Sequence, residues 1–107
     1  MVTLRVSPED AIRQLMDRIE AINTIPRTPQ GIEYYDFIRW CSKTWQVADA
    51  IYGSDDPHAE ELRTMTLQNC ACDAHMKAVI LAGAYQDRLL GFIREIEDGM
   101  AGAGTHQ

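Results

Sequence analysis

Apolar side chains recur at intervals of three and four residues through most of this 107-residue chain. Residues spaced in this way share one face of an α-helix, because a helix completes a turn every 3.6 residues. The pattern predicts four helices, at about residues 7–23, 31–52, 56–70 and 73–98, the third of them short. No segment shows the apolar–polar alternation between turn signals that is typical of a strand. We therefore expect an all-α fold, a small four-helix bundle.

Residues with a known preference for helix ends mark three of the predicted boundaries. Ser7 can accept a hydrogen bond from an unpaired amide of the first turn, and Pro8 follows at a position where no N–H is needed. Gly53 can take the left-handed conformation that ends a helix. Asp56 and Pro57 then repeat the starting signal for the third helix. Residues 69–73 could form a break between two helices or continue as helix, and the sequence does not decide between these possibilities.

The second predicted helix has the widest apolar face. Two neighbouring seams cover more than half of its circumference, and they consist of Tyr34, Ile38, Cys41, Trp45, Ala48 and Tyr52, and of Phe37, Trp40, Val47 and Ile51. A helix of this kind is contacted on two sides, so we expect it to be central. The last helix has an apolar seam that comprises Ala78, Leu81, Tyr85, Leu89, Phe92 and Ile96.

This surplus of apolar positions indicates self-association, because an exposed apolar stripe on a helix usually marks a partner surface. We expect a homodimer. The large side chains expected either in the core or on a partner surface are Trp40, Trp45, Tyr85 and Phe92.

Length and composition fit one globular domain. Hydrophobic residues make up 46% of the chain and charged residues 24%, which are the values of folded proteins. We expect one helical domain over residues 1–98. Residues 99–107 are rich in Gly and Ala, and we expect a flexible tail there.

The charge balance excludes several partners. The net charge is −6, and the chain has only two lysines, Lys43 and Lys77, with no basic run. Binding to nucleic acid or to an anionic membrane is not expected, since both depend on clustered Lys and Arg. The N-terminal residues show no apolar segment of a signal peptide. Three cysteines, an odd number, fit reduced thiols, and we expect a cytoplasmic protein.

One short segment carries residue types that bind metals. Cys70, Cys72 and His75 are ligands that suit zinc or another transition ion. Cys70 and Cys72 could share an ion only in a loop, because residues two positions apart point in different directions on a helix. On a helix, Cys72 and His75 could share an ion instead, because residues three positions apart lie on one face. His58 could add a ligand. The alternative is that these are small, partly buried thiols and a capping-region histidine, and we expect no cofactor.

Catalytic residues are not evident. The chain lacks the Glu-x-x-His pair of helical di-metal sites, and its carboxylates, among them Glu60, Glu61 and Glu95, fall on polar faces where we expect solvation. The aromatic side chains of the second helix favour a core or interface role over a stacking platform. Trp40 with Arg39 and Lys43 is the one spot where a small anion or a base could bind.

One stretch resembles a known kind of module. It contains Trp40, Thr44, Ile51-Tyr52-Gly53, Asp56-Pro57-His58 and Leu62, and is similar to small helical modules of uncharacterised prokaryotic proteins. Those modules stand alone or precede effector domains in proteins suspected of phage defence. The resemblance implies an accessory, interaction-mediating role and supplies no catalytic residues.

Taken together, these patterns favour a noncatalytic helical module that acts through protein–protein contact and associates with itself. The alternative is a metal- or thiol-dependent sensor that uses Cys70, Cys72 and His75. A small-molecule enzyme with a pocket between helices is a third possibility, for which the sequence shows no residue signature.

Overall fold

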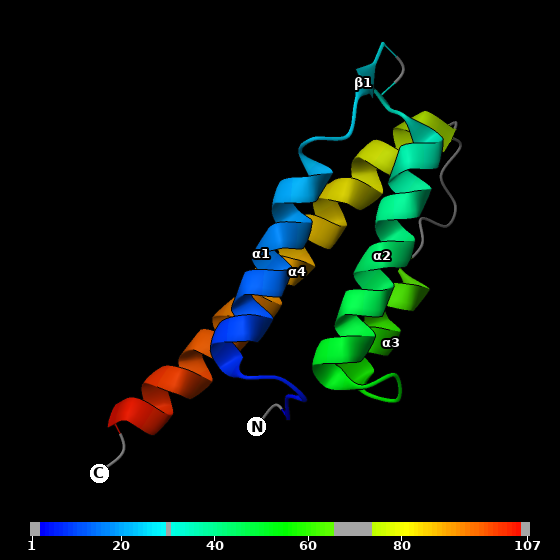
Figure 1. The fold of residues 1–107 in the computed structure, drawn as a ribbon. Coiled ribbons are helices and arrows are strands. Elements are labelled where there is room, and N and C mark those ends of the chain that lie inside the picture. Colours follow the sequence, from blue (N-terminus) through cyan, green and yellow to red (C-terminus); the bar gives the residue numbers. More distant parts are fainter. Residues whose placement is uncertain (1–2, 30, 66–73, 106–107) are drawn as a thin grey trace.

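Four helices make up most of the described chain (Figure 1). The computed structural model describes residues 3–29, 31–65 and 74–105. The helices within these ranges are α1 (Pro8–Ile22), α2 (Tyr34–Tyr52), α3 (Pro57–Thr64) and α4 (Ala74–Thr105). The prediction of a small all-α four-helix fold is confirmed.

The start of α1 follows the sequence signal. Ser7 is the N-cap, its Oγ accepts a 3.1 Å hydrogen bond from the amide of Asp10, and Pro8 occupies the first helical position. The apolar stripe faces inward, and its fully or nearly buried members are Ala11, Leu15, Ile19 and Ile22. Burial of this stripe against α2 and α4 holds α1 in place, since hydrophobic burial is the main favourable contribution to folding.

A β-hairpin between α1 and α2 corrects the prediction of a strand-free chain. Strand β1 (Arg27–Thr28) pairs antiparallel with β2 (Gly31–Ile32), with Arg27 opposite Ile32. Strands of two residues are too short to show alternation, so the sequence pattern could not reveal them. Gly31 has a φ of 144°, a backbone conformation that favours glycine. The hairpin also moves the start of α2 from the predicted residue 31 to Tyr34.

Helix α2 contacts α1, α3 and α4, as expected for a central element. Its buried residues are Phe37, Trp40, Cys41, Thr44, Ala48, Ile51 and Tyr52. Ile38, which the sequence placed in an apolar seam, is 45% exposed instead. α2 ends at Tyr52, and its C-cap Gly53 has a φ of +98°, a positive value that favours glycine, as the sequence predicts.

Helices α3 and α4 both differ in length from the prediction. α3 ends at Thr64 rather than at residue 70, and Met65 has extended backbone. The carbonyl of Leu62 accepts hydrogen bonds from Tyr85 and Trp45, so further helical turns are not needed to satisfy it. α4 continues through residues 99–105, where we expected a flexible tail. No proline interrupts this segment, so no backbone N–H is lost to end the helix.

The helices form an elongated molecule of 53 × 25 × 19 Å. α1 and α4 pack against each other and run in opposite directions, while α2 and α3 lie beside them (Figure 1). Among the described residues, no helix combines the length and apolar character required to cross a membrane. The packing of α3 beside α4 brings together side chains that are far apart in the sequence.

Candidate functional site

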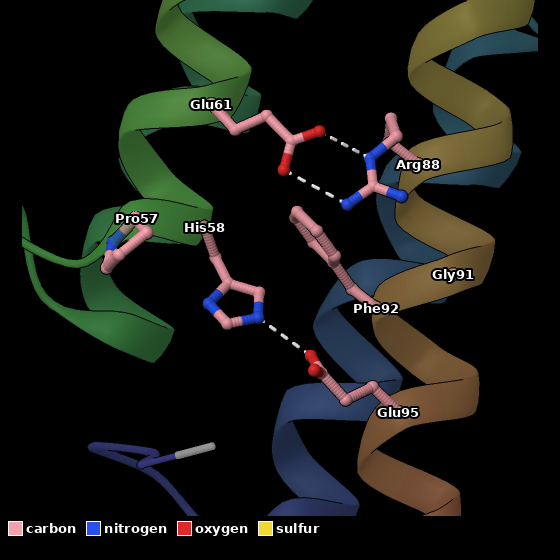
Figure 2. A pocket seen from close by; sticks show the side chains of 7 residues that line it. All are labelled: Pro57, His58, Glu61, Arg88, Gly91, Phe92 and Glu95. Carbon is pink, nitrogen blue, oxygen red and sulfur yellow. Dashed lines mark hydrogen bonds and ion pairs between the residues drawn. The ribbon is translucent and has the colours of Figure 1, made fainter. Parts of the chain in front are cut away.

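A cavity of about 250 Å³ opens between α3 and α4 (Figure 2). Its lining comes from Pro57, His58 and Glu61 of α3 and from Arg88, Gly91, Phe92 and Glu95 of α4. Arg88, Phe92 and Glu95 are spaced four and three positions apart, so they share one face of α4, and Gly91 lies beside them.

His58 lies between two carboxylates. Asp56 accepts a 2.8 Å hydrogen bond from the backbone amide of His58, as an N-cap does, and the same Oδ1 atom lies 2.7 Å from His58 Nδ1. On the other side of the ring, Nε2 lies 2.7 Å from Oε1 of Glu95 (Figure 2). When the ring is protonated, both nitrogens donate to a carboxylate, and the bond to Glu95 joins α3 to α4.

These carboxylates favour the charged form of the histidine. Partial burial lowers the pKa of His58, but the hydrogen bonds and negative charges of Asp56 and Glu95 outweigh it, and the net effect is a raised pKa. The imidazolium is therefore the form that the folded protein stabilises.

Two aromatic rings fix the orientation of the imidazole. Tyr52 at the end of α2 stacks on it with ring centres 4.4 Å apart and an interplanar angle of 5°. Phe92 of α4 meets it edge-on at 5.0 Å. Stacking on Tyr52 also suits a cationic ring.

A second charged bridge closes the other end of the cavity. Arg88 Nε lies 2.6 Å from Glu61 Oε2, and its Nη2 donates to Glu61 Oε1 at 3.0 Å, so the pair is bidentate (Figure 2). The guanidinium carbon of Arg88 also lies 5.0 Å from the centre of the Phe92 ring. Glu61 and Glu95 are 43% and 51% exposed, as expected for solvated acids, and each also forms an ion pair between α3 and α4.

The chemistry available to this cavity follows from these bonds. With both nitrogens bonded to carboxylates, His58 has no lone pair with which to accept a proton or bind a metal. A role as base or ligand would require one of the two bonds to break. Asp56, His58 and Glu95 together form a charged bridge between α3 and α4, called here the His58 clamp.

The four large side chains singled out in the sequence lie in or against the core. Trp40 is 4% exposed, and Tyr85 and Phe92 are each 1% exposed. Trp45 is half-buried, and its Nε1 lies within hydrogen-bond distance of both Leu62 O and Tyr85 Oη. Tyr85 contacts Trp40 edge-on, with ring centres 5.3 Å apart. The structure therefore brings Trp40, Trp45 and Tyr85 together, while Phe92 lies against the His58 clamp.

The candidate metal ligands fall mainly outside the described residues. Cys70 and Cys72 both lie outside the described residues. For His75 the structure describes only the backbone, which belongs to the first turn of α4. In the described ranges, no group of three or more His, Cys, Asp or Glu side chains is arranged to hold a metal ion.

A second cavity, of about 210 Å³, lies between α1 and α2. It contains Arg39, Trp40 and Lys43, the spot that the sequence indicated for an anion, and adds Arg18, Ala21 and Asp36.

Comparison of the chain with protein-family models, curated proteins and solved structures finds no match. The His58 clamp was missed in the sequence because Glu95 is 37 positions from His58. The only local signal is the Asp56-Pro57-His58 run, which predicts a helix start. That interpretation is confirmed, but it does not reveal the partner on α4.

Proposed function

We propose that this protein is a noncatalytic helical module that acts through protein–protein contact and pairs with a second copy of itself through α2. The observation that carries this proposal is an uncharged exposed stripe on α2, formed by Tyr35, Ile38, Ser42 and Gln46 and called here the α2 stripe. Tyr35 is 72% exposed and Ile38 45%. Spacings of three and four place these residues side by side along the helix.

A second copy suits this stripe because the protein is acidic. Two chains with a net charge of −6 repel each other wherever their charged surfaces meet. The α2 stripe contains no charged side chain, so two copies can meet there without placing like charges face to face. Two-fold pairing would place the Tyr35 and Ile38 side chains of both copies in one interface.

α4 also carries an exposed large apolar side chain, Ile80, which is 44% exposed. Large apolar side chains supply most of the binding energy in interfaces of this type. A noncatalytic role is further supported by His58, whose two ring nitrogens are both bonded within the protein.

Sedimentation equilibrium of the full chain over a range of concentrations tests the proposal. We expect a dimer for the wild type and a monomer for Ile38→Glu, since two buried glutamates would repel each other without partners. Met16→Glu is the matched control: Met16 is 40% exposed and belongs to a different helix, α1, and this variant should remain dimeric. A wild-type protein that stays monomeric at about 100 µM, a concentration well above the Kd of a specific dimer, would overturn the proposal.

Native mass spectrometry under reducing conditions distinguishes the sensor alternative. A bound metal that disappears in the Cys72→Ala/His75→Ala variant would favour that alternative. An unchanged mass and subunit number in the same variant would favour the interaction module.

A further inference from the structure

The cavity between α1 and α2 concentrates positive charge on an acidic protein. Three of its six lining residues are cationic, namely Arg18, Arg39 and Lys43, and one is acidic, Asp36. The chain as a whole has 10 Lys and Arg against 16 Asp and Glu. Charge of one sign lining a concave surface focuses the local electrostatic potential and attracts counter-ions.

Arg18 is the residue that most clearly lacks a partner. Its Nη1 atom is buried and has no hydrogen-bond partner within the described part of the chain. The adjacent Asp17 is 63% exposed and lies near Arg13 instead. Burial lowers the pKa of Arg18, and the negative charge of the adjacent Asp17 offsets this effect only in part. An unpaired, partly buried guanidinium is unfavourable, and an anion in the cavity would remove that penalty.

The core holds the backbone of Arg18 in position. Trp40 Nε1 donates a 2.8 Å hydrogen bond to the carbonyl of Arg18. Trp40 is itself packed between Phe37, which stacks on it, and Tyr85, which meets it edge-on. The guanidinium therefore extends from a fixed point, and such preorganisation lowers the entropy lost on binding.

Only one of the three cations is neutralised. Arg39 forms an ion pair with Asp36 one turn earlier on α2. Neither Arg18 nor Lys43 forms an ion pair with any acid among the residues that the structure describes. The cavity therefore keeps two uncompensated positive charges.

We propose that this cavity binds a phosphate group, either as inorganic phosphate or as the monoester end of a small molecule. A phosphate dianion matches the two uncompensated charges, whereas a single carboxylate would neutralise only one. The planar guanidinium of Arg18 presents paired donors that match phosphate oxygens, and Lys43 adds a mobile ammonium. A volume of about 210 Å³ accommodates one such group, and this proposal does not rest on self-association through the α2 stripe.

Isothermal titration with inorganic phosphate, at constant ionic strength and with chloride as reference, tests this proposal. We expect saturable binding to the wild type, weakened about tenfold by Arg18→Met and about threefold by Lys43→Gln. Arg94→Gln is the matched control, because it removes one positive charge at an exposed position of α4 outside the cavity. It should bind phosphate as the wild type does.

Thermal unfolding supplies a second readout that a merely structural Arg18 would not give. Without phosphate, Arg18→Met should unfold at a higher temperature than the wild type, because the unpaired cation is gone. Phosphate should raise the unfolding temperature of the wild type and raise that of Arg18→Met by clearly less at the same concentration. If the Arg18 variant fails to fold, Lys43→Gln, a substitution at an exposed position, replaces it in this measurement, and phosphate should then raise its unfolding temperature by less than that of the wild type.

The comparison of inorganic phosphate with glycerol 3-phosphate separates the two sources of the group. Tighter binding of glycerol 3-phosphate would assign a monoester ligand, and equal binding would assign free phosphate. Absence of binding at about 10 mM phosphate, well above the Kd of a functional site, would overturn the proposal. An equal loss of affinity in Arg94→Gln would also overturn it, since the effect would then come from net charge alone.

Discussion

The hydroxyl of Tyr85 donates a 2.8 Å hydrogen bond to the backbone carbonyl of Leu62. This bond joins the middle of α4 to the last turn of α3, where a helix leaves its carbonyls unsatisfied. Trp45 of α2 donates to the same carbonyl at 3.0 Å. Three helices thus meet at one acceptor in the core, and burial raises the pKa of Tyr85 to about 12, which keeps the phenol protonated as a donor.

Removal of this hydroxyl should destabilise the fold. Tyr85→Phe keeps the ring and deletes one donor, so we expect a loss of about 1–2 kcal/mol in the free energy of unfolding. The loss stays moderate because Trp45 still donates to Leu62. Urea denaturation measures the change, and Tyr34→Phe is the control that should show almost none, because the Tyr34 hydroxyl forms no hydrogen bond within the described part of the chain. Equal effects of the two substitutions would contradict the role given to the bond.

The His58 clamp predicts a dependence of stability on pH. The pKa of His58 is raised in the folded protein because Asp56 and Glu95 favour the imidazolium. Its stabilising contribution is therefore fully present below the unfolded pKa of about 6.5 and is lost as pH rises through the folded pKa. Each unit by which the pKa is raised corresponds to about 1.4 kcal/mol. Urea denaturation between pH 5 and pH 9, scanned at intervals of about one unit, measures the loss.

A variant of the clamp isolates the contribution of Glu95. Glu95→Gln keeps an oxygen that can accept from Nε2 but removes the negative charge, so the pKa of His58 should fall towards its ordinary value. An NMR titration of the assigned His58 ring protons reports that pKa directly. Glu97→Gln is the matched control, since Glu97 is an exposed acid of α4 that does not line the cavity. A His58 pKa that is the same in wild type and Glu95→Gln would show that the bridge does not form in solution.

Two glycines should respond in opposite directions to the same substitution. At Gly83, within α4, an added Cβ meets nothing within 4 Å, so Gly83→Ala should stabilise the protein by about 0.5–1 kcal/mol through helix propensity. At Gly53 the φ of +98° is strained for alanine, and the Cβ would lie 2.8 Å from Arg5 Nε. Gly53→Ala should therefore destabilise by about 1 kcal/mol or more. Thermal unfolding measures both changes: the unfolding temperature should be higher than that of the wild type for Gly83→Ala and lower for Gly53→Ala.

The sequence was sufficient for features encoded over a few neighbouring residues. The caps at Ser7 and Asp56 and the positive φ of Gly53 were all predictable because each depends on local backbone geometry. The central position of α2 followed from its wide apolar face. Features that depend on distant partners were not predictable, and the bond of His58 to Glu95 and the cavity that joins Arg18 to Lys43 are examples.

The end of α3 illustrates the same limit. Periodicity predicted a helix to residue 70, but Leu62 gains its hydrogen bonds from Tyr85 and Trp45, which no local pattern connects to it. Ile38 is a further case, because its spacing fits a buried seam of α2 but the tertiary arrangement leaves it 45% exposed. Periodicity identifies a helix face, whereas the packing of the other helices decides how much of that face is buried.

Thr44 in the middle of α2 gives a final prediction. The side chain is 1% exposed, and its Oγ1 is buried with no hydrogen-bond partner within the described part of the chain. Replacement by valine keeps the branched shape and exchanges an unsatisfied hydroxyl for a methyl group.

Thr44→Val should therefore raise the free energy of unfolding by about 1 kcal/mol, because burial of an unpaired hydroxyl is unfavourable. Thr44→Ser is the informative control: it keeps the hydroxyl and removes the methyl, so it should lower stability through the cavity that it leaves. Urea denaturation of the three proteins gives their order, which we expect to be Val, then Thr, then Ser. A Val variant less stable than wild type would mean that the Thr44 hydroxyl has a partner in solution.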